Sequence, residues 1–532
     1  MNYIQGTDRN QTFLFPGTID EIISEDNSVR VIDVFVDNLR LDDLGFSKTK
    51  LAHTGRYPYH RGDLLKLYIY GYLNKVRSSR DLAKECQRNL EAIWLLKGVK
   101  PKYKTIADFR KDHSKQIRQV FRNFVELCQH WDLFGKEMIA IDSTSFRAVN
   151  SKKNNYNQKK IERHLKYIGD KIEEYLEELD KNDTTEKDEP THTKEEIQNR
   201  IKELEDRKKD YKELEKQLKD SDEDQISTTD PDSRLIVKNG QPAKVSYNPQ
   251  VAVDDKNKLI ADYKNTNQND RKQLSDMSTR SKKVLNTEKL DSLADKGYHN
   301  AEELHKCEQA NIATYVGEPE YRNNKPMPKP GYYKNKFIFN KKENHYICPQ
   351  GQILTTNGND YKKHHRSGYT LVKHYKTKAC KSCKAKHLCT ENKHGRLIER
   401  SQYQESADAN HQRIKTEKEK YLQRQMIVEH PFGTIKRNWG YDYVLVKGLK
   451  KVDGEFGLIF LCYNLRRVIN ILGVKELIYR LKACFCKISK ILAILRRFKE
   501  QNISEIFLKT LKTEVLYGLI LKPNFINFIT LK

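Results

Sequence analysis

Apolar residues recur at three- and four-residue spacing through the first 135 positions, and this periodicity predicts helices. Within residues 61–86 the apolar stripe breaks near Gly71, and residues 105–131 repeat the pattern with Thr105 as the expected N-cap. Lysine and arginine occupy many of the remaining positions. We therefore expect a basic, all-helical domain over residues 1–135, for which contact with DNA and simple solvation of the charges are equally good interpretations.

The periodicity changes after residue 136. The stretch EMIAID is short, apolar and β-compatible, and it ends at Asp142. Residues 243–255 and 258–268 predict the two strands of a hairpin, with the turn near residues 255–257. Farther along, we expect strands over 290–295 and 311–317 and helices over 270–285, 300–310 and 405–470. This alternation indicates an α/β core.

Two segments interrupt that core. In residues 158–222, Ile, Leu and Tyr recur at helical spacing between Glu and Lys, which predicts an antiparallel helical hairpin that acts as a solvated spacer or a dimer contact. Residues 319–400 are rich in Pro, Lys and Cys, and their pattern is irregular. Residues 474–532 are apolar and basic. A terminal packing helix is the favoured interpretation there, with binding to DNA, a partner protomer or a membrane surface as alternatives.

Charge narrows the class of partner. The 532 residues carry a formal net charge of +26, and the isoelectric point is near 9.4. On a folded protein, such an excess favours phosphate backbones. We find no run of about 20 apolar residues and no signal-like layout at the N-terminus. Membrane insertion and secretion are therefore disfavoured, and we expect a cytoplasmic protein that binds nucleic acid.

Three acidic residues stand out once the interruptions are set aside. Asp142 and Asp295 end expected strands, and Glu429 lies in a later helix, so the three can converge at one edge of a sheet. Clustered carboxylates need a cation, and hard oxygen ligands suit Mg²⁺ or Mn²⁺. A pair of such ions activates a water or a 3′-hydroxyl and stabilises the leaving oxygen in phosphodiester chemistry. Spacing alone does not select these three, because most strand-end aspartates are solvated or cap a turn.

Ordered sequence blocks do select them. The blocks AIDSTSFRAVNS, DPDSRLIVKNGQPAKVSYNPQVAVD, LADKGYHNAEEL and IVEHPFGTIKRNWGYDYVLVKGL follow one another, and GDLLKLYIYGYLNKVRSSRDLAKEC and TIADFRK precede them. Together they resemble the DDE transposases of bacterial insertion sequences, over residues 15–470. The resemblance implies that Asp142, Asp295 and Glu429 are the acidic triad that binds Mg²⁺ or Mn²⁺.

The resemblance also implies a fold. It predicts an α/β RNase H-like core, a mixed sheet flanked by helices, formed by residues 136–157, 223–318 and 401–473 after the all-α N-terminal domain. The charged helical hairpin of residues 158–222 and the Cys-rich segment of residues 319–400 are then insertions into this core.

Further DNA-binding residues follow from the same resemblance. Lys436 matches the last position of the family's Tyr-x2-Arg-x3-Glu-x6-Lys signature and is expected to hold a DNA phosphate. Tyr421 and Arg424 fit its first positions, although four residues rather than three separate Arg424 from Glu429. Pro431 predicts a kink or a restart of the helix before Lys436.

Weaker candidates accompany these residues. Arg437, Tyr247 and Gln250 are candidates for DNA contact, although the last two are also explained as simple strand residues. The DPDSR stretch is interpreted as a turn or as a neighbour of the metals, and Asp270 as a cap of the following helix.

The implied activity is cleavage at transposon ends followed by strand transfer into target DNA. The partners would be the terminal inverted repeats and the target duplex, bound by a homodimer in the bacterial cytoplasm, with no membrane involved. Two alternatives stay open, a catalytically inactive DNA-binding protein derived from a transposase and a metal-dependent DNA nuclease.

Four cysteines form a separate cluster. Cys348, Cys380, Cys383 and Cys389 follow the spacing C-x31-C-x2-C-x5-C, which suits a tetrahedral structural Zn²⁺ site. A set of unmetallated thiols in a Lys-rich loop explains the pattern equally well. The remaining cysteines lie in apolar or helical stretches and are interpreted as ordinary buried thiols.

Overall fold

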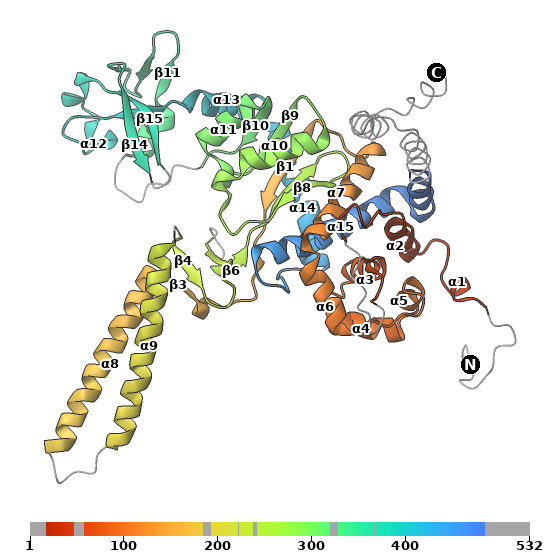
Figure 1. The fold of residues 1–532 in the computed structure, drawn as a ribbon. Coiled ribbons are helices and arrows are strands. Elements are labelled where there is room, and N and C mark those ends of the chain that lie inside the picture. The colour runs from red at the N-terminus through yellow and green to blue at the C-terminus, as the bar shows by residue number, and fades with distance from the viewer. Residues whose placement is uncertain are drawn as a thin grey trace, which may run out of the picture.

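The computed structural model describes residues 17–46, 58–184, 193–221, 223–237, 242–319, 328–365 and 368–484. Within them, helices surround a central five-stranded sheet, a long helical hairpin projects from one side, and a small β-rich module lies beyond the sheet (Figure 1). Residues 485–532, the greater part of the basic tail, lie outside the described residues.

The N-terminal region is helical, as predicted. Its elements are α1 (Ile19–Ile22), α2 (Ser28–Asp37), α3 (Arg61–Leu73), α4 (Ser79–Arg88), α5 (Leu90–Leu95), α6 (Tyr103–Asp112) and α7 (Ser114–His130). Helix α3 does not stop at Gly71 but continues to Leu73. A Cβ at residue 71 would lie 2.4 Å from the carbonyl oxygen of Val76, so glycine is required where the chain leaves the helix.

The predicted single helix over residues 105–131 is wrong, and so is its cap. Two helices occupy the segment, α6 and α7, and they meet at His113. The N-cap of α6 is Lys102 rather than Thr105. The ring of His113 stacks on Phe109 with ring centroids 4.7 Å apart, so a tertiary aromatic cluster, which spacing does not reveal, turns the chain here.

The central sheet has the strand order β10-β9-β1-β7-β8. Strand β1 pairs antiparallel with β7 and parallel with β9, β9 pairs parallel with β10, and β7 pairs antiparallel with β8. This mixed sheet, flanked by helices after an all-helical region, confirms the predicted RNase H-like fold class. The strands are β1 (Met138–Ser143), β7 (Gln250–Asp254), β8 (Ile260–Lys264), β9 (Leu290–Ala294) and β10 (Ile312–Val316).

Helices cover both faces of the sheet, and strand alternation tells the faces apart. On one face, Ser278 of α10 (Leu274–Leu285) hydrogen-bonds to Ser292 of β9. On the other, Lys420 of α14 (Lys418–Phe432) forms an ion pair with Asp291, one residue earlier on the same strand. Helix α14 therefore lies on the face opposite α10.

Further helices complete the core. Helix α13 (Gln404–Thr416) runs along the edge strand β10, where Asn410 accepts the N–H of Val316 and donates to its carbonyl. This contact protects the sheet edge from pairing with another chain. Helix α11 (Ala301–Gln309) packs between α10 and α13.

Helix α15 (Leu449–Leu472) joins the two ends of the chain. It packs along α7, where a Cβ on Gly454 would lie 2.5 Å from the Cα of Ser114. Asp453 accepts a 2.5 Å hydrogen bond from Arg118 of α7. One continuous cluster of buried side chains therefore extends from the N-terminal helices to the central sheet.

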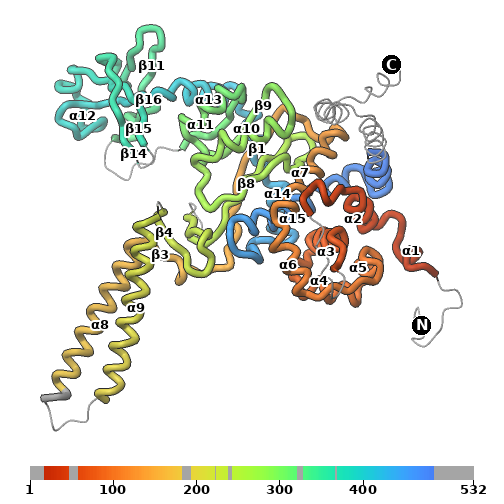
Figure 2. Tube along the Cα trace, in the orientation of Figure 1, coloured from red at the N-terminus to blue at the C-terminus, as the bar shows by residue number. Residues whose placement is uncertain are grey.

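The predicted helical hairpin is confirmed. Helices α8 (Gln158–Thr184) and α9 (Lys194–Asp220) lie side by side and project away from the body (Figure 2). A capping box between Thr193 and Glu196 starts α9. The short strands β3 (Asn155–Asn157) and β4 (Gln225–Ser227) pair at its base.

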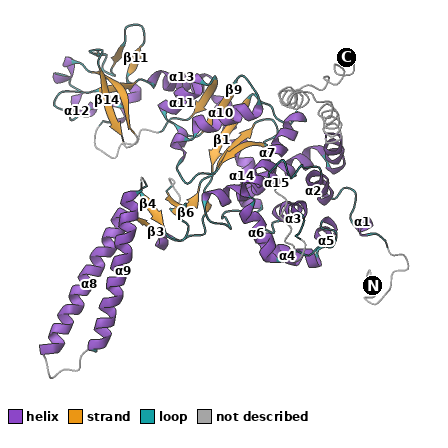
Figure 3. Ribbon diagram, in the orientation of Figure 1, coloured by secondary structure: helices purple, strands orange, loops and turns teal. Residues whose placement is uncertain are grey.

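The remaining elements are further strands and short helical segments (Figure 3). Near the core these are β2 (Phe146–Arg147), η1 (Lys152–Asn154), β5 (Arg234–Ile236), β6 (Lys244–Tyr247), η2 (Asp270–Lys272), η3 (Lys296–Tyr298) and the π-helical η7 (Gly433–Asn438). The Cys-rich segment holds η4 (Pro330–Tyr332), η5 (Lys334–Lys336), β11 (Ile338–Asn340), β12 (His345–Ile347), β13 (Ile353–Leu354), β14 (Asp360–His365), β15 (Gly368–Tyr375), η6 (Lys378–Lys381), α12 (Lys386–Cys389) and β16 (Ile398–Ser401).

Within the described ranges, no single helix is both long and apolar enough to cross a membrane. Helix α15 and the helical residues that follow it meet the criterion only as a pair bent by 110°.

Candidate active site at the ends of the parallel strands

Two of the predicted triad residues occupy neighbouring positions. Ile141 of β1 and Ala294 of β9 are partners in the parallel ladder, and Asp142 and Asp295 directly follow them. Neighbouring strands lie about 4.8 Å apart, and side chains at matched positions share a face. Both aspartates therefore lie at the carboxyl ends of their strands on the face that α14 covers.

Local hydrogen bonds orient both carboxylates. Asp142 Oδ1 accepts the N–H of Ser143 at 2.7 Å, and Asp295 Oδ1 accepts the N–H of Gly297 at 2.9 Å, which makes Asp295 the N-cap of η3. Both side chains are partly exposed. Carboxylate oxygens held in this way, with solvent access, are suitable ligands for a hard divalent cation.

The third predicted ligand lies on the helix above these strands. Glu429 is exposed on α14 and accepts a 2.7 Å hydrogen bond from Gln425 Nε2. Helix α14 packs against β1, β7 and β9. Nevertheless, no three Asp, Glu, His or Cys side chains of the described residues approach one another closely enough to hold one metal ion. The register of β1 and β9 places the two aspartates at neighbouring positions, and Glu429 does not complete a group of three carboxylates with them among the described residues.

The basic residues after Glu429 lie on a π-helical turn. Pro431 is accommodated within α14, and the helix continues into η7. There Lys436 Nζ donates to the carbonyl of Ser145 at 2.6 Å and lies 4.9 Å from the centre of the Phe146 ring. Lys436 therefore contacts the loop that leaves Asp142, while Arg437 beside it is exposed.

The residues before Glu429 lie along the same helix. The Tyr421 hydroxyl packs against Gly317, just beyond β10, where an added Cβ would be 2.4 Å from that oxygen. Arg424, one turn later, is partly exposed.

Tyr247, a candidate DNA contact, is fully buried and serves the fold. Its hydroxyl donates to the Asp230 carboxylate at 2.8 and 2.9 Å, and that carboxylate also accepts the N–H of Gly448. Asp232 accepts the N–H of Leu449, so the DPDSR turn holds the start of α15. Burial raises the pKa of Tyr247 well above its ordinary value.

A polar network beside Asp142 was not anticipated from the sequence. Asp270 Oδ1 accepts hydrogen bonds from Ser143 Oγ (2.6 Å), Asn248 Nδ2 (2.7 Å) and Gln250 Nε2 (2.9 Å). Gln250 is fully buried and also accepts from the Tyr298 hydroxyl. The pairing of Ser143 with Gln250 across β1 and β7 explains why these side chains meet.

The interpretation of Asp270 as a helix cap is therefore wrong. Asn269 caps η2, because its side chain accepts the N–H of Arg271. Burial is the main cause that raises the pKa of Tyr298, and the charges of Asp270, Asp142 and Asp295 all add to that rise, so the three carboxylates lie near the same hydroxyl. A fourth carboxylate thus belongs to the candidate site.

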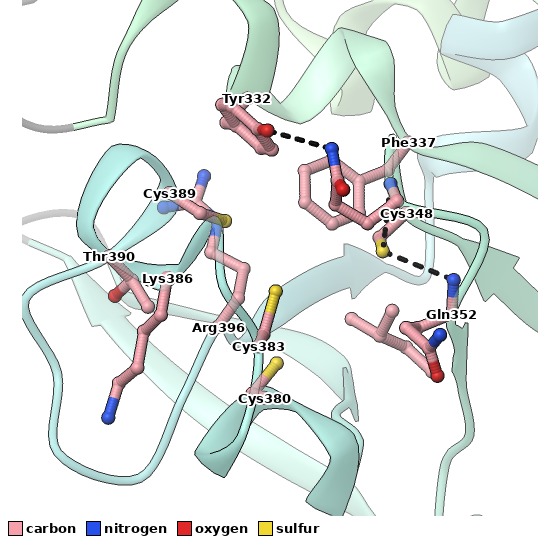
Figure 4. A pocket seen from close by; sticks show the side chains of 12 residues that line it. Tyr332, Phe337, Cys348, Gln352, Cys380, Cys383, Lys386, Cys389, Thr390 and Arg396 are labelled. Atoms are coloured by element: carbon pink, nitrogen blue, oxygen red, sulfur yellow. Dashed lines mark hydrogen bonds between the residues drawn. The ribbon is translucent and has the colours of Figure 1, made fainter.

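The four clustered cysteines line one small cavity in the Cys-rich segment (Figure 4). Cys348 follows β12, Cys380 lies in η6, Cys383 lies two residues after η6, and Cys389 ends α12. Burial raises the pKa of Cys389, Arg396 opposes that rise, and each of the other three thiols adds to it. The four sulfurs therefore share one electrostatic environment.

Comparisons with known proteins match two segments of the chain to transposase domains. Residues 347–469 match the family described as "Transposase DDE domain", and residues 17–112 match the family described as "Transposase domain (DUF772)". A cryo-EM structure of piggyBac transposase, in a synaptic complex with hairpin DNA, is similar over 91% of this chain and 84% of that chain, with 9% identity and a TM-score of 0.31. That likeness is too weak to carry an argument. The curated proteins include no match. Two separate segments of the chain are therefore similar to transposase domains, one of them to the DDE domain.

Proposed function

We propose that this protein is an active DDE transposase, which cleaves DNA at the ends of its element and joins the freed 3′-hydroxyls to target DNA. Asp142, Asp295 and Glu429 would hold the divalent metal ions, and Lys436 would hold a phosphate. The single observation that supports this most is the pair of aspartates at matched positions on adjacent parallel strands, beneath the helix that carries Glu429.

The residues present suit Mg²⁺ or Mn²⁺. Asp142 and Asp295 offer oriented, partly exposed carboxylates. Asp270 is also partly exposed, but its carboxylate is already engaged by three side-chain donors. Bound metal would supply Lewis-acid stabilisation of the phosphoryl oxygens. The chain's own contribution is to orient the two aspartates through the N–H groups of Ser143 and Gly297, and to place Lys436 at the loop after Asp142. Helix α14, which carries Glu429, packs on the same strands.

Glu429 must approach the aspartates for this chemistry. Its carboxylate is exposed and accepts a hydrogen bond from Gln425, one turn earlier on α14, so rotation of the side chain meets little resistance. We therefore assign Glu429 to a ligand position that closes when metal and DNA are present.

DNA binding follows from charge and from the family. The chain carries a net +26, and such an excess strengthens binding to phosphate backbones. The terminal inverted repeats of the element and a target duplex would be the substrates, and a homodimer in the cytoplasm would bring two ends together.

The decisive experiment is a strand-transfer assay on the DNA that flanks the gene, with Mg²⁺ or Mn²⁺. The wild type should produce joined products. Glu429→Gln should abolish them while end binding survives, and Glu419→Gln, an exposed glutamate on the same helix, should behave as the wild type.

The alternatives predict different outcomes. End binding without metal-dependent cleavage by the wild type would favour a DNA-binding relic. Cleavage without joining would favour a nuclease. Full activity in Glu429→Gln would remove Glu429 from the site.

A further inference from the structure

The Cys-rich segment has a hydrophobic core of its own. Its buried hydrophobic side chains are Phe337, Tyr346, Leu354, Tyr375 and Ile398, separate from the main core. Modules shorter than about 70–80 residues seldom fold on so small a core without a disulfide or a metal. All nine described cysteines carry free thiols, which leaves a metal as the means of stabilising this module.

Cysteine side chains sit where such a metal would stabilise the module. Cys348 and Cys389 pack directly against the small core. Together with Cys380 and Cys383, they come from three separate chain segments and line the same cavity (Figure 4). A metal bound by all four would tie the end of β12 to η6 and α12.

The turn at Cys348 is built to stabilise a thiolate. Its sulfur accepts the backbone N–H groups of Gln350 (3.4 Å) and Gln352 (3.3 Å). Gly351 makes this geometry possible, because it adopts a φ of +74° that other residues rarely tolerate. Backbone donors aimed at sulfur favour the charged form, which is the form that binds metal.

Cationic side chains surround the same cavity. Arg396 and Lys386 line it, and Arg396 Nε is buried without a hydrogen-bond acceptor. Four thiolates around Zn²⁺ leave a charge of −2, so adjacent cations lower the cost of assembling them. A thiolate would also supply the acceptor that Arg396 Nε lacks. Gly395 keeps its backbone against Cys380, since a Cβ there would lie 2.4 Å from the Cβ of Cys380.

We infer that Cys348, Cys380, Cys383 and Cys389 bind one Zn²⁺ that stabilises the Cys-rich module. Soft thiolates in a set of four select Zn²⁺ over Mg²⁺. The sulfurs do not converge on one point in the structure, so the inference requires changes of side-chain rotamer around the shared cavity. This inference does not depend on the proposed function.

Metal analysis of the purified full-length chain tests the inference directly. We expect one Zn²⁺ per chain in the wild type and in Cys484→Ser, a partly exposed cysteine outside the cluster. Cys383→Ser and Cys348→Ser should lose it. Co²⁺ exchanged into the wild type should give the intense visible absorption of a tetrahedral cobalt–thiolate site.

A second readout separates loss of metal from global misfolding. Limited proteolysis after chelation, or in Cys383→Ser, should cut within residues 328–401 and leave the central sheet resistant. A wild type without zinc, or zinc retained by both cluster variants, would overturn the inference. An octahedral cobalt spectrum would also overturn it. All of these readouts are independent of DNA and of activity.

Discussion

Aspartates lie at both ends of the central sheet, but they differ in burial and in their hydrogen-bond partners. At the carboxyl end of β1, Asp142 and Asp295 are partly exposed and lie side by side. At the opposite end, Asp254 of β7 is fully buried and accepts the N–H groups of Gly135, Lys136 and Lys256.

The difference distinguishes a buried carboxylate that holds a turn from two carboxylates that are partly exposed. Burial raises the pKa of Asp254 to about 6, even though its backbone donors oppose that rise. Its oxygens accept hydrogen bonds from the backbone of the turn that precedes β1. Asp142 and Asp295 retain access to solvent, so their oxygens can still serve a cation. The residue type and its place at a strand end are therefore insufficient to predict what an aspartate does. The surrounding hydrogen-bond donors and the burial of the side chain decide it.

The largest expected effect is on strand-transfer activity, which should depend on the aspartates at one end of the sheet and not on Asp254 at the other. Asp142→Asn or Asp295→Asn should reduce strand transfer by at least about 100-fold, because each loses a charged metal ligand worth about 3 kcal/mol or more of transition-state stabilisation. The melting temperature should change little. Asp254→Asn is the matched change at the other end of the sheet. The molecules of this variant that are folded should have the strand-transfer activity of the wild type. Equal loss of transfer in all three variants would erase the distinction.

The second effect concerns stability and its dependence on pH. Asp254→Asn should lower the free energy of unfolding by about 1–3 kcal/mol, because the amide NH₂ faces a backbone N–H. The folded-state pKa of Asp254 is raised from 3.8 to about 6, so the wild type gains stability from this group at low pH and loses it as pH rises through about 6.

The difference in the free energy of unfolding between the wild type and Asp254→Asn should therefore become smaller from pH 4 to pH 7, by up to about 3 kcal/mol. Urea unfolding at several pH values measures it. A gap that stays constant or widens with pH would show that Asp254 does not titrate in this way.

A smaller effect tests the buried Tyr247–Asp230 pair. Tyr247→Phe should cost about 1–2 kcal/mol of stability, because Asp230 loses a hydroxyl donor while it stays buried. Affinity for DNA ends should not change. Thermal unfolding and a binding titration on the same samples give both quantities. Weaker DNA binding at unchanged stability would instead indicate that Tyr247 contacts DNA.

The smallest effect concerns Lys436. Lys436→Gln should reduce the slope of log affinity against log salt concentration by about 0.9, the value for one phosphate contact. Binding titrations across a salt series measure it. Lys418→Gln, an exposed lysine at the start of α14, serves as the control. Identical slopes in the two variants would place Lys436 away from the DNA backbone.

Local pattern was sufficient for the sheet. Alternation and strand-end turns located β1, β8, β9 and β10. The single strand expected over residues 243–255 is instead two strands, β6 and β7, which belong to different sheets. The carboxyl ends of two adjacent parallel strands share an edge, which is why Asp142 and Asp295 are neighbours. The hairpin of α8 and α9 was equally clear, because its heptad-like apolar spacing needs no partner elsewhere.

Tertiary contacts decided what local pattern could not. The break at His113 depends on stacking with Phe109, and the burial of Tyr247 depends on Asp230 and the start of α15. Asp270 joined the site through side chains of β1 and β7 rather than through its own helix. The metal role of the triad stays a prediction, since Glu429 does not complete a group of three carboxylates with the two aspartates among the described residues.

The contact between α7 and α15 also bears on how the protein is made. Arg118 and Asp453 are 335 positions apart, and at about 5–20 residues per second roughly 20–70 s of translation separate them. During that interval the apolar face of α7 awaits its partner. Contacts between such distant residues slow folding, so the core is expected to close only when synthesis is nearly complete. Chaperone dependence of newly made chains should therefore be concentrated on the N-terminal helices.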